Sequence, residues 1–163
     1  MLALEISMRR KDREITDKEK IEQIIAACDC CRIGFCDAGE VYIVPLNFGY
    51  TEQNGQYTFY FHGAKEGRKF DLLQGAPRVG FEMDTGYALV PGKDAASCSA
   101  RFQSVIGNGV AEIVTDDAER IAGLCALMRH NAGREVTEFP KAALDATCVF
   151  KLTVESLACK EHL

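Results

Sequence analysis

The sequence lacks a long apolar run, and its 163 residues include no tryptophan. No stretch approaches the roughly 20 apolar residues of a membrane-spanning helix, so we expect no membrane partner. The net charge of −5 at pH 7 gives no indication of nucleic-acid binding. The mildly apolar residues 1–6 come before a basic group, which is the reverse of a signal peptide. We therefore expect one cytoplasmic domain over residues 1–163, with a basic N-terminal arm over residues 1–15.

Histidine is also scarce, with three residues, and the eight cysteines form no favourable zinc pattern. Cys28, Cys30 and Cys31 lie together, and Cys36 follows them. A zinc site built on this C-D-C-C stretch would have poor geometry, so we expect no metal site. Free and mostly buried thiols in a reducing cytosol are the favoured interpretation.

Strand-like alternation dominates the chain in short segments. The expected strands are residues 32–36, 41–50, 57–62, 78–83, 101–114 and 147–155. The expected helices begin at the capping box of Thr16 and Glu19, after Gly67, and at the cap Asp116. Because Asn54 and Gly55 form a hairpin turn, the first three strands should run as an antiparallel meander. About six antiparallel strands with flanking helices predict a mainly β fold, a small barrel.

Three irregular features interrupt this pattern. Pro45 cannot donate to a ladder, so its strand should lie at an edge, at a bulge or beside something other than a strand. Gly107 and Gly109 suggest a bend or bulge, as barrels need. Residues 84–97 have little regularity and are expected to form a mobile or substrate-facing loop.

The most informative stretch joins a strand to a short helix through residues 63–69, read G-A-K-E-G-R-K. Two glycines expose backbone amides, and Lys65, Arg68 and Lys69 place three cations where the helix begins. Such a helix start can bind a phosphate dianion. The competing interpretation is a surface turn that binds nothing. The loop is not a Walker A motif, because Phe70 stands where that motif needs a hydroxyl for magnesium.

Four stretches together resemble the flavin-binding split-barrel superfamily that includes pyridoxamine 5′-phosphate oxidase, and most closely its nitroimidazole-resistance branch. They are residues 8–15, residues 44–50 (V-P-L-N-F-G-Y), residues 59–73, and residues 101–109 (R-F-Q-S-V-I-G-N-G). The resemblance implies a six-stranded antiparallel split barrel of the FMN-binding type, forming a homodimer with FMN at the subunit interface. The residues that bind pyridoxal phosphate in the true oxidases are not recognisable in residues 157–163.

The resemblance also implies roles for particular residues. It places Arg68 and Lys69 on the FMN phosphate, the backbone of residues 44–48 along the flavin ring, and Ser104 with Gln103 near the flavin. His62 matches the active-site histidine of the nitroimidazole-resistance branch. The implied cofactor-binding set is Val44, Pro45, Leu46, Asn47, Phe48, His62, Gly63, Ala64, Lys65, Gly67, Arg68, Lys69, Gln103 and Ser104.

Two functions are compatible with these features. One is an FMN-dependent oxidoreductase that takes electrons from NAD(P)H or another donor and reduces a small planar acceptor such as a nitro-aromatic, with His62 as proton donor. The other is a binding protein that holds FMN, or haem, as a store, sensor or electron carrier. From the residues alone, the favoured interpretation of His62 is a strand-end histidine bonded to the backbone, and that of Ser104 is a structural strand residue.

Overall fold

The computed structural model describes residues 8–162, so residues 1–7 of the expected N-terminal arm lie outside the described part. In chain order the elements are η1 (Lys11–Arg13), β1 (Glu14–Ile15), α1 (Lys18–Ala26), β2 (Cys31–Asp37), β3 (Glu40–Leu46), β4 (Gly49–Gln53), β5 (Gln56–Gly63), α2 (Arg68–Leu73), β6 (Arg78–Val90), η2 (Ala95–Ser97), β7 (Ser99–Ile113), α3 (Asp117–Ala132), α4 (Lys141–Ala146) and β8 (Cys148–His162).

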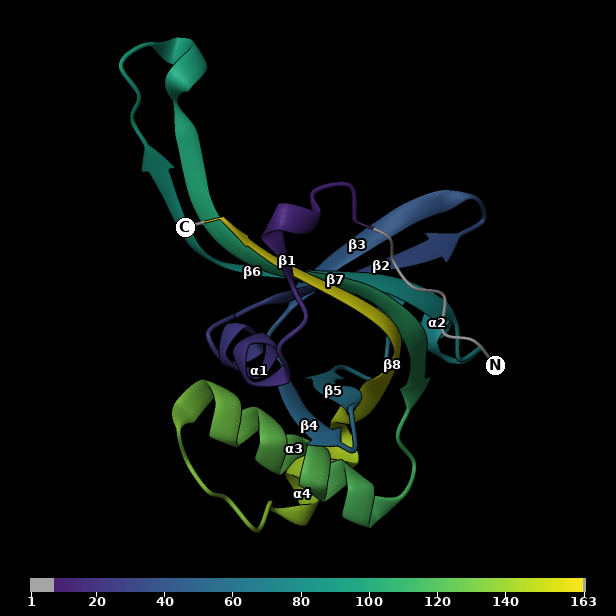
Figure 1. Ribbon diagram of the computed structural model, residues 1–163. Coiled ribbons are helices and arrows are strands. Elements are labelled where there is room, and N and C mark those ends of the chain that lie inside the picture. Colours follow the sequence, from purple (N-terminus) through teal and green to yellow (C-terminus); the bar gives the residue numbers. More distant parts are fainter. Residues whose placement is uncertain (1–7, 163) are drawn as a thin grey trace.

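The strands form one antiparallel sheet that curls around the core (Figure 1). Its order is β3-β2-β6-β7-β8-β5-β4, and β1 pairs with β8 at Glu14 and Ile15. The expectation of a mainly β, antiparallel split barrel is confirmed. The expected count of six strands was too low, because residues 41–50 form two strands and because β1 is too short to show alternation. The end of the expected N-terminal arm is therefore part of the sheet.

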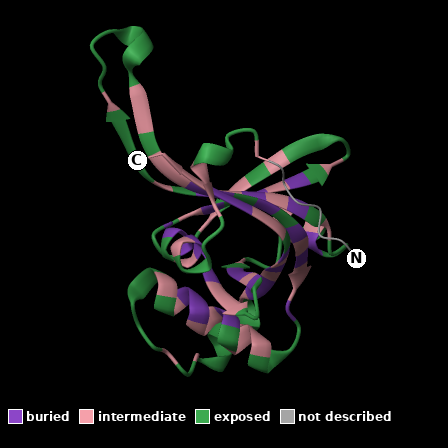
Figure 2. Ribbon diagram, viewed as in Figure 1, coloured by how far each residue is buried: buried purple, intermediate pink, exposed green. Residues whose placement is uncertain are grey.

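The core lies inside this curl and is built from alternate residues of the strands (Figure 2). Phe59 and Phe61 on β5 are fully buried, as are Phe150 and Leu152 on the neighbouring β8. The rings of Phe61 and Phe150 are stacked with centroids 5.0 Å apart. Burying each such side chain contributes roughly 1.5–3 kcal/mol, so this aromatic seam fixes the pairing of β5 with β8.

Helices α1 and α3 begin at aspartates. Asp116 accepts a hydrogen bond from the Glu119 amide at 2.8 Å, which confirms the expected cap of α3. The cap of α1 is Asp17, which accepts from the Lys20 amide at 2.8 Å. The predicted capping by Thr16 was wrong by one residue, because the side-chain oxygen must reach an amide three positions along, in the first turn of α1.

Helix α3 packs directly on β4, and a glycine permits the contact. A Cβ at Gly49 would lie 2.2 Å from the backbone nitrogen of Leu127 and 2.3 Å from the carbonyl carbon of Ala126. Only a residue without a side chain lets the helix backbone approach the strand this closely. Gly49 therefore sets the distance between α3 and the sheet.

Residues 41–50 do not form one strand, and the expected three-strand meander was wrong. β3 and β4 lie at opposite ends of the sheet order, and Asn47 and Phe48 connect them. The chain leaves the ladder here because the Phe48 side chain is fully buried in the core. The interpretation of Pro45 as an edge residue is confirmed: it pairs with Arg32 of β2, and β3 ends the sheet order among the described strands.

Residues 84–90 are strand rather than loop, so the expectation of a loop over residues 84–97 was wrong for the first half of that segment. β6 continues to Val90 and β7 begins at Ser99, and the two form a hairpin that projects from the body of the molecule (Figure 1). A register shift between Thr85 and Ala88 accompanies Gly86, whose φ is +65°. This bulge interrupts the alternation by which a strand is recognised in sequence.

The glycines of β7 behave as expected. The register between β7 and β8 shifts between Asn108 and Gly109, which is the predicted bulge. A Cβ at Gly107 would lie 2.3 Å from the Ser156 carbonyl oxygen, and one at Gly109 would lie 2.2 Å from that of Thr153. The bend therefore needs both glycines, because the partner strand occupies the space of a side chain.

The cysteines are distributed between core and surface. Cys28, Cys31, Cys148 and Cys159 are buried, whereas Cys36 and Cys98 are exposed. Burial raises the pKa of the Cys28 thiol to about 12 and that of the Cys159 thiol to about 11. These two thiols stay protonated near neutral pH and act as small apolar side chains. Residues 8–162 contain no group of three or more His, Cys, Asp or Glu side chains placed to hold a metal ion.

Candidate functional site

The glycine loop connects β5 to α2 in the way that the sequence predicts. Gly67 caps α2 with φ of +92°, a backbone conformation that residues with a side chain rarely adopt. α2 starts at Arg68. α2 is a short helix of six residues, and Leu73 anchors it in the core. The loop therefore leaves its amides and its cations at the surface, next to the end of β5.

Lys69 is the half-buried cation of this loop. Its ammonium lies 5.5 Å from the Phe150 ring centroid, and a Cβ at Gly63 would meet its Nζ at 2.8 Å. Desolvation by burial lowers its pKa. Among residues 8–162 no carboxylate pairs with it. A partly desolvated ammonium without an anionic neighbour is a favourable position for a bound anion.

Arg68 points elsewhere, toward the hairpin of β2 and β3. Its Nε donates to Asp37 Oδ2 at 2.7 Å, and its guanidinium carbon lies 4.5 Å from the Tyr42 ring centroid. The ion pair and the cation–π contact hold Arg68 over β3 rather than beside Lys69. In this structure the two residues expected to clamp one phosphate therefore diverge, although they are adjacent in sequence.

The third cation and the histidine of this region differ in their surroundings. Lys65 Nζ donates to the Asp145 carbonyl oxygen at 2.5 Å, at the C-terminal end of α4. A cavity of about 300 Å³ beside it is lined by Lys65, Arg120 and Cys148, among others. His62 pairs with Val149 in the ladder and is exposed, as is Ala64. His62 is thus accessible to a reactant at the sheet surface.

The segment expected along a flavin ring spans β3 and the connection to β4. Pro45 and Asn47 are exposed, whereas Val44 and Leu46 are half-buried and pack against the core. The Phe48 carbonyl accepts a hydrogen bond from Asn131 Nδ2 at 2.7 Å. β3 lies at the edge of the sheet formed by the described strands, so one side of its backbone has no neighbouring strand. A backbone that binds a ligand needs such a free side.

Gln103 and Ser104 are neighbours on β7 and point to opposite faces of the sheet. Gln103 Nε2 donates to Glu161 Oε2 at 2.8 Å, so its amide is already engaged. Ser104 is 9% exposed and pairs with Asp84 in the ladder. Only one of the two side chains can therefore line a given face of the barrel.

The structure does not bring His62 and Ser104 together within one chain. Both strands pair with β8, His62 opposite Val149 and Ser104 opposite Lys160. These two positions lie near opposite ends of β8 (Cys148–His162).

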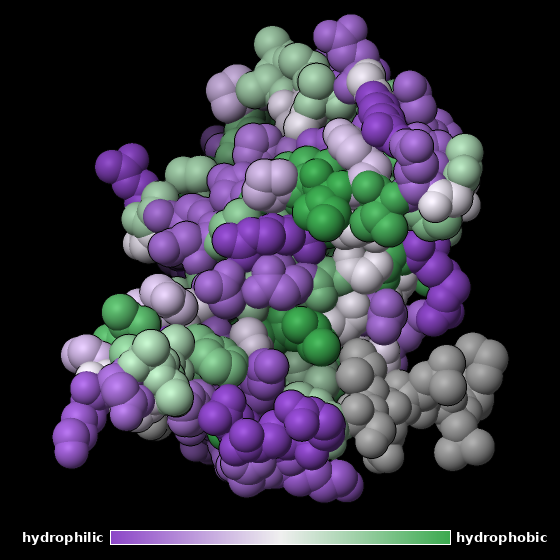
Figure 3. All heavy atoms as spheres, turned by 90° about the horizontal axis from the view of Figure 1, so that it is seen from above, coloured by the Kyte–Doolittle hydropathy of each residue, from purple (hydrophilic) through white to green (hydrophobic). Residues whose placement is uncertain are grey.

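An exposed apolar face accompanies these site residues. Val41 is 74% exposed and Ile43 61%, and Ile106 on β7 is also exposed. The ladder places Ile43, Gly34, Gly80 and Asn108 in one row across four strands, so these side chains share a face. Viewed from above, the molecule shows apolar side chains at the surface among polar ones (Figure 3). The apolar faces of the expected strands 41–50 and 101–114 are also the surface that the sequence suggests for a twofold partner.

Sequence analysis also missed Asp37 and Tyr42. The stretch Asp37-Ala38-Gly39-Glu40 has the composition of a turn, and Tyr42 is one of several aromatic residues in an alternating strand. Both residues contact Arg68 because α2 lies beside the β2–β3 hairpin. Asp37 and Arg68 are 31 positions apart in the sequence. No local pattern reveals such a contact, and an acidic residue in a turn is ordinarily solvated.

The fold and the loop define a class of protein: a flavin-binding split barrel. The family model for pyridoxamine 5′-phosphate oxidase matches residues 17–161, and the chain belongs to this family. The resemblance seen in the sequence is confirmed. No curated protein matches the chain. None of the described helices is long and apolar enough to cross a membrane.

Solved structures support the same assignment. The chain is 32% identical to a candidate 5-nitroimidazole antibiotic resistance protein from Bacteroides thetaiotaomicron VPI-5482, with a TM-score of 0.77 over 91% of this chain and 86% of that one. The flavocytochrome Anf3 from Azotobacter vinelandii is 22% identical, with a TM-score of 0.77 over 96% and 72%. An FAD and haem binding protein from Mycobacterium smegmatis is 19% identical, with a TM-score of 0.77 over 91% and 73%. The last two show the fold alone.

Proposed function

We propose that this protein is an FMN-dependent oxidoreductase that reduces a small planar, nitro-aromatic-like acceptor. The observation that carries the proposal is Lys69, a half-buried ammonium beside a glycine loop with no carboxylate pairing with it among residues 8–162. A phosphate dianion would supply the missing countercharge, and the amides of residues 63–67 would add hydrogen-bond donors. The residues present therefore fit the phosphate of FMN.

Arg68 would complete this phosphate site by leaving Asp37. Its ion pair is solvent-exposed, with side-chain exposures of 47% for Arg68 and 33% for Asp37, so exchanging one anion for another costs little. Lys65 lies on the same loop and can approach from the other side. In this proposal Gly63, Ala64 and Gly67 contribute backbone, and the side chains contribute charge.

The proposal includes a homodimer with FMN at the interface, and two features of the chain support it. The exposed apolar face of Val41, Ile43 and Ile106 is a surface that a twofold partner can cover. The separation of His62 from Ser104 along β8 supports a site that takes residues from two protomers. Light scattering of the flavin-bound protein at micromolar concentration should give twice the mass of one chain. A monomer that retains flavin would contradict an interfacial site.

When bound, FMN supplies the redox chemistry, accepting electrons from NAD(P)H or another donor and passing them to the acceptor. The protein orients the ring along the free edge of residues 44–48 and excludes water from one side of it. His62 is exposed at the end of β5, where its imidazole can donate a proton to a reduced acceptor near neutral pH. The named function of the Bacteroides relative supports a nitro-aromatic acceptor.

The cofactor assignment is tested first. The purified protein should be yellow and release FMN on heating, and riboflavin should bind far more weakly than FMN. Losing a buried, charge-assisted contact typically weakens affinity by about 30- to several-thousand-fold. The double variant Arg68→Ala, Lys69→Ala should therefore purify folded but without FMN. A colourless wild type that binds no added FMN would contradict the assignment, whereas a yellow double variant would contradict only the phosphate position.

The reaction is tested separately through His62. Turnover of a nitroimidazole with NAD(P)H should be at least about 100-fold slower in His62→Ala, the usual contribution of a positioned proton donor. Because the resemblance also places His62 beside the cofactor, the rate is compared per molecule of bound FMN. Equal rates in wild type and variant would remove His62 from the mechanism while leaving FMN binding intact.

A second candidate is a non-catalytic carrier of FMN or haem. Two structures of the same fold are named as a flavocytochrome and as an FAD and haem binding protein, which supports this alternative. A flavin that is reducible but passes electrons to none of a broad panel of acceptors would favour a carrier. A Soret band without flavin in protein purified from its own host would favour haem.

A further inference from the structure

A cavity of the described structure lies away from the glycine loop, between α1, β4 and α3. Its volume is about 620 Å³, which is enough for a small organic molecule. Its lining residues are Glu22 and Ala26 of α1, Tyr50, Thr51, Glu52 and Gln53 of β4, and Ala126, Arg129 and His130 of α3. β4 ends the sheet order at the opposite side from β3, so the cavity runs along a free sheet edge.

Two aromatic rings form one wall of this cavity. The rings of Tyr50 and His130 meet edge to face, with centroids 5.7 Å apart and planes at 76°. His130 lies 4.4 Å from the Phe48 ring, and its Nε2 donates to the Cys28 carbonyl at 2.8 Å. The hydrogen bond and the core contact fix the imidazole orientation. The wall is therefore rigid and offers aromatic surface to a ligand.

The charge facing the cavity is negative. Glu22 and Glu52 line it, and neither makes an ion pair within residues 8–162. Burial raises the pKa of Tyr50, and the nearby Glu22 carboxylate adds to this effect. Glu52 accepts a hydrogen bond from the Gly55 amide, which holds it in place.

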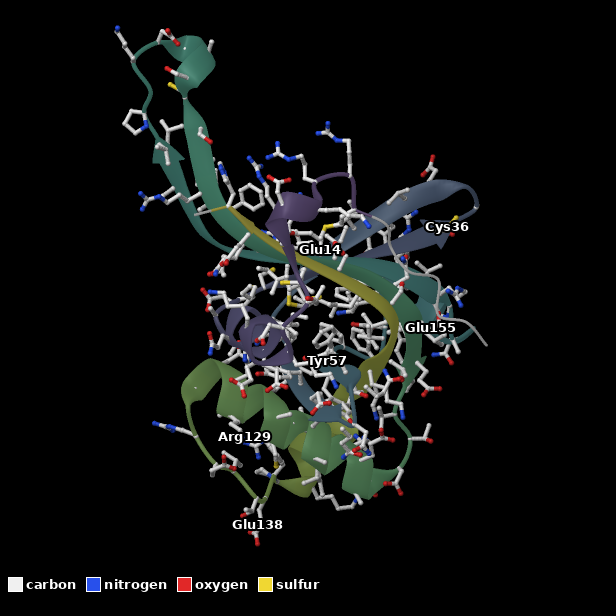
Figure 4. The ribbon with its side chains drawn as sticks, viewed as in Figure 1. Glu14, Cys36, Tyr57, Arg129, Glu138 and Glu155 are labelled. Carbon is white, nitrogen blue, oxygen red and sulfur yellow. The ribbon has the colours of Figure 1, made fainter. Side chains whose placement is uncertain are left out.

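The one cation in the lining is already neutralised. Arg129 Nε donates to Glu135 Oε1 at 2.7 Å, and its Nη2 donates to Oε2 at 3.2 Å, which is a bidentate pair. Figure 4 shows the position of Arg129 on α3. The cavity therefore combines an aromatic wall, two carboxylates without cationic partners and a backbone edge, which together suit a cation rather than an anion.

We propose that this cavity binds a small organic cation with a planar or alkyl body, such as an amidinium or a primary amine. The body lies against Tyr50 and His130, and the cationic head lies between Glu22 and Glu52. FMN carries a phosphate dianion and would be repelled here, so the site is separate from the glycine loop. It goes beyond the proposed function and does not depend on it.

The test compares a cation with its neutral isostere. Benzamidinium and benzamide have the same shape and differ in charge, and their affinities for the full-length protein are measured by calorimetry at low salt. Benzamidinium should bind at least about tenfold more tightly, because hydrogen bonds to charged groups exceed neutral ones by this order. Equal affinities, or no benzamidinium binding, would overturn the proposal.

Two variants locate the binding. Glu22→Gln keeps the size of the side chain and removes its charge, so benzamidinium should bind about tenfold more weakly. Glu138→Gln removes a charge from an exposed residue outside the lining and is the matched control (Figure 4). Equal weakening in both variants would show a general effect of net charge and overturn the site. FMN content is measured independently. A lack of benzamidinium binding therefore does not contradict the cofactor proposal, and a lack of FMN does not contradict the cation site.

Discussion

The glycine loop and the α1–β4–α3 cavity differ in charge and in origin. The loop carries Lys65, Arg68 and Lys69 within five consecutive residues, whereas the cavity takes Glu22, Glu52 and His130 from three elements far apart in sequence. The first region can be read from a local motif, and the second exists only because α3 packs against β4 at Gly49. Together, the two proposals place an anion in the glycine loop and a cation in the α1–β4–α3 cavity.

The largest expected effect comes from breaking the contact that forms the cavity. Gly49→Ala places a Cβ 2.2 Å from the Leu127 amide nitrogen, so α3 must move. Overpacking of this kind costs typically 1–3 kcal/mol and occasionally more, so we expect a loss of about 3 kcal/mol in the free energy of unfolding. Denaturant titration measures it.

The matched control for Gly49 is Gly75, where a Cβ would meet the Leu72 carbonyl oxygen at an ordinary 3.9 Å. Gly75→Ala should change the unfolding free energy by less than about 1 kcal/mol. If both variants lose the same stability, the close approach of α3 is not what supports this side of the molecule. In the absence of denaturant, the folded fraction of the Gly49→Ala variant should still bind FMN, because the glycine loop lies away from the contact between α3 and β4.

A smaller effect separates the two adjacent cations of the loop. Lys69→Met removes the half-buried, unpaired ammonium and should weaken FMN binding by about 30-fold or more. Arg68→Ala should cost less, about tenfold, because Arg68 must first leave Asp37. Fluorescence quenching of added FMN measures both affinities. Equal losses would mean that the pairing seen with Asp37 has no influence on binding.

The depressed pKa of Lys69 predicts a dependence on pH. Burial favours the neutral amine in the ligand-free fold, so between the lowered pKa of folded Lys69 and its ordinary value of 10.5 the fold binds fewer protons than the unfolded chain, and its stability rises with pH. A bound phosphate needs the ammonium, so FMN affinity should fall over the same range. Lys69→Met should abolish both trends, and an unchanged pH profile in this variant would assign them to another group.

The smallest expected effect concerns Asp37. Asp37→Asn frees Arg68 from its exposed ion pair, which contributes at most about 1 kcal/mol. FMN should then bind up to about fivefold more tightly. Asp12→Asn breaks the exposed pair with Arg10 and serves as the control for a lost negative charge. Weaker FMN binding in Asp37→Asn would instead show that Asp37 positions Arg68 for the phosphate.

Much of the fold was predictable because it depends on local chemistry. Alternation located most strands, Asp116 located the start of α3, and Gly107 and Gly109 located the bulge of β7. The failures have equally physical causes. The register shift before Ala88 hid the long hairpin of β6 and β7, and the buried Phe48 divided one apparent strand into two.

The sequence by itself determined the loop, its three cations and the family of the chain, because those features lie in short contiguous motifs whose backbone needs are met by particular residues such as Gly67. Only the tertiary structure decided how the cations are used. Packing of α2 beside the β2–β3 hairpin pairs Arg68 with Asp37, whereas the core around Phe150 leaves Lys69 half-buried and unmatched by any carboxylate in the described chain. The interaction between two charges depends on their distance in space, so two cations that are adjacent in sequence can have different ion-pair partners.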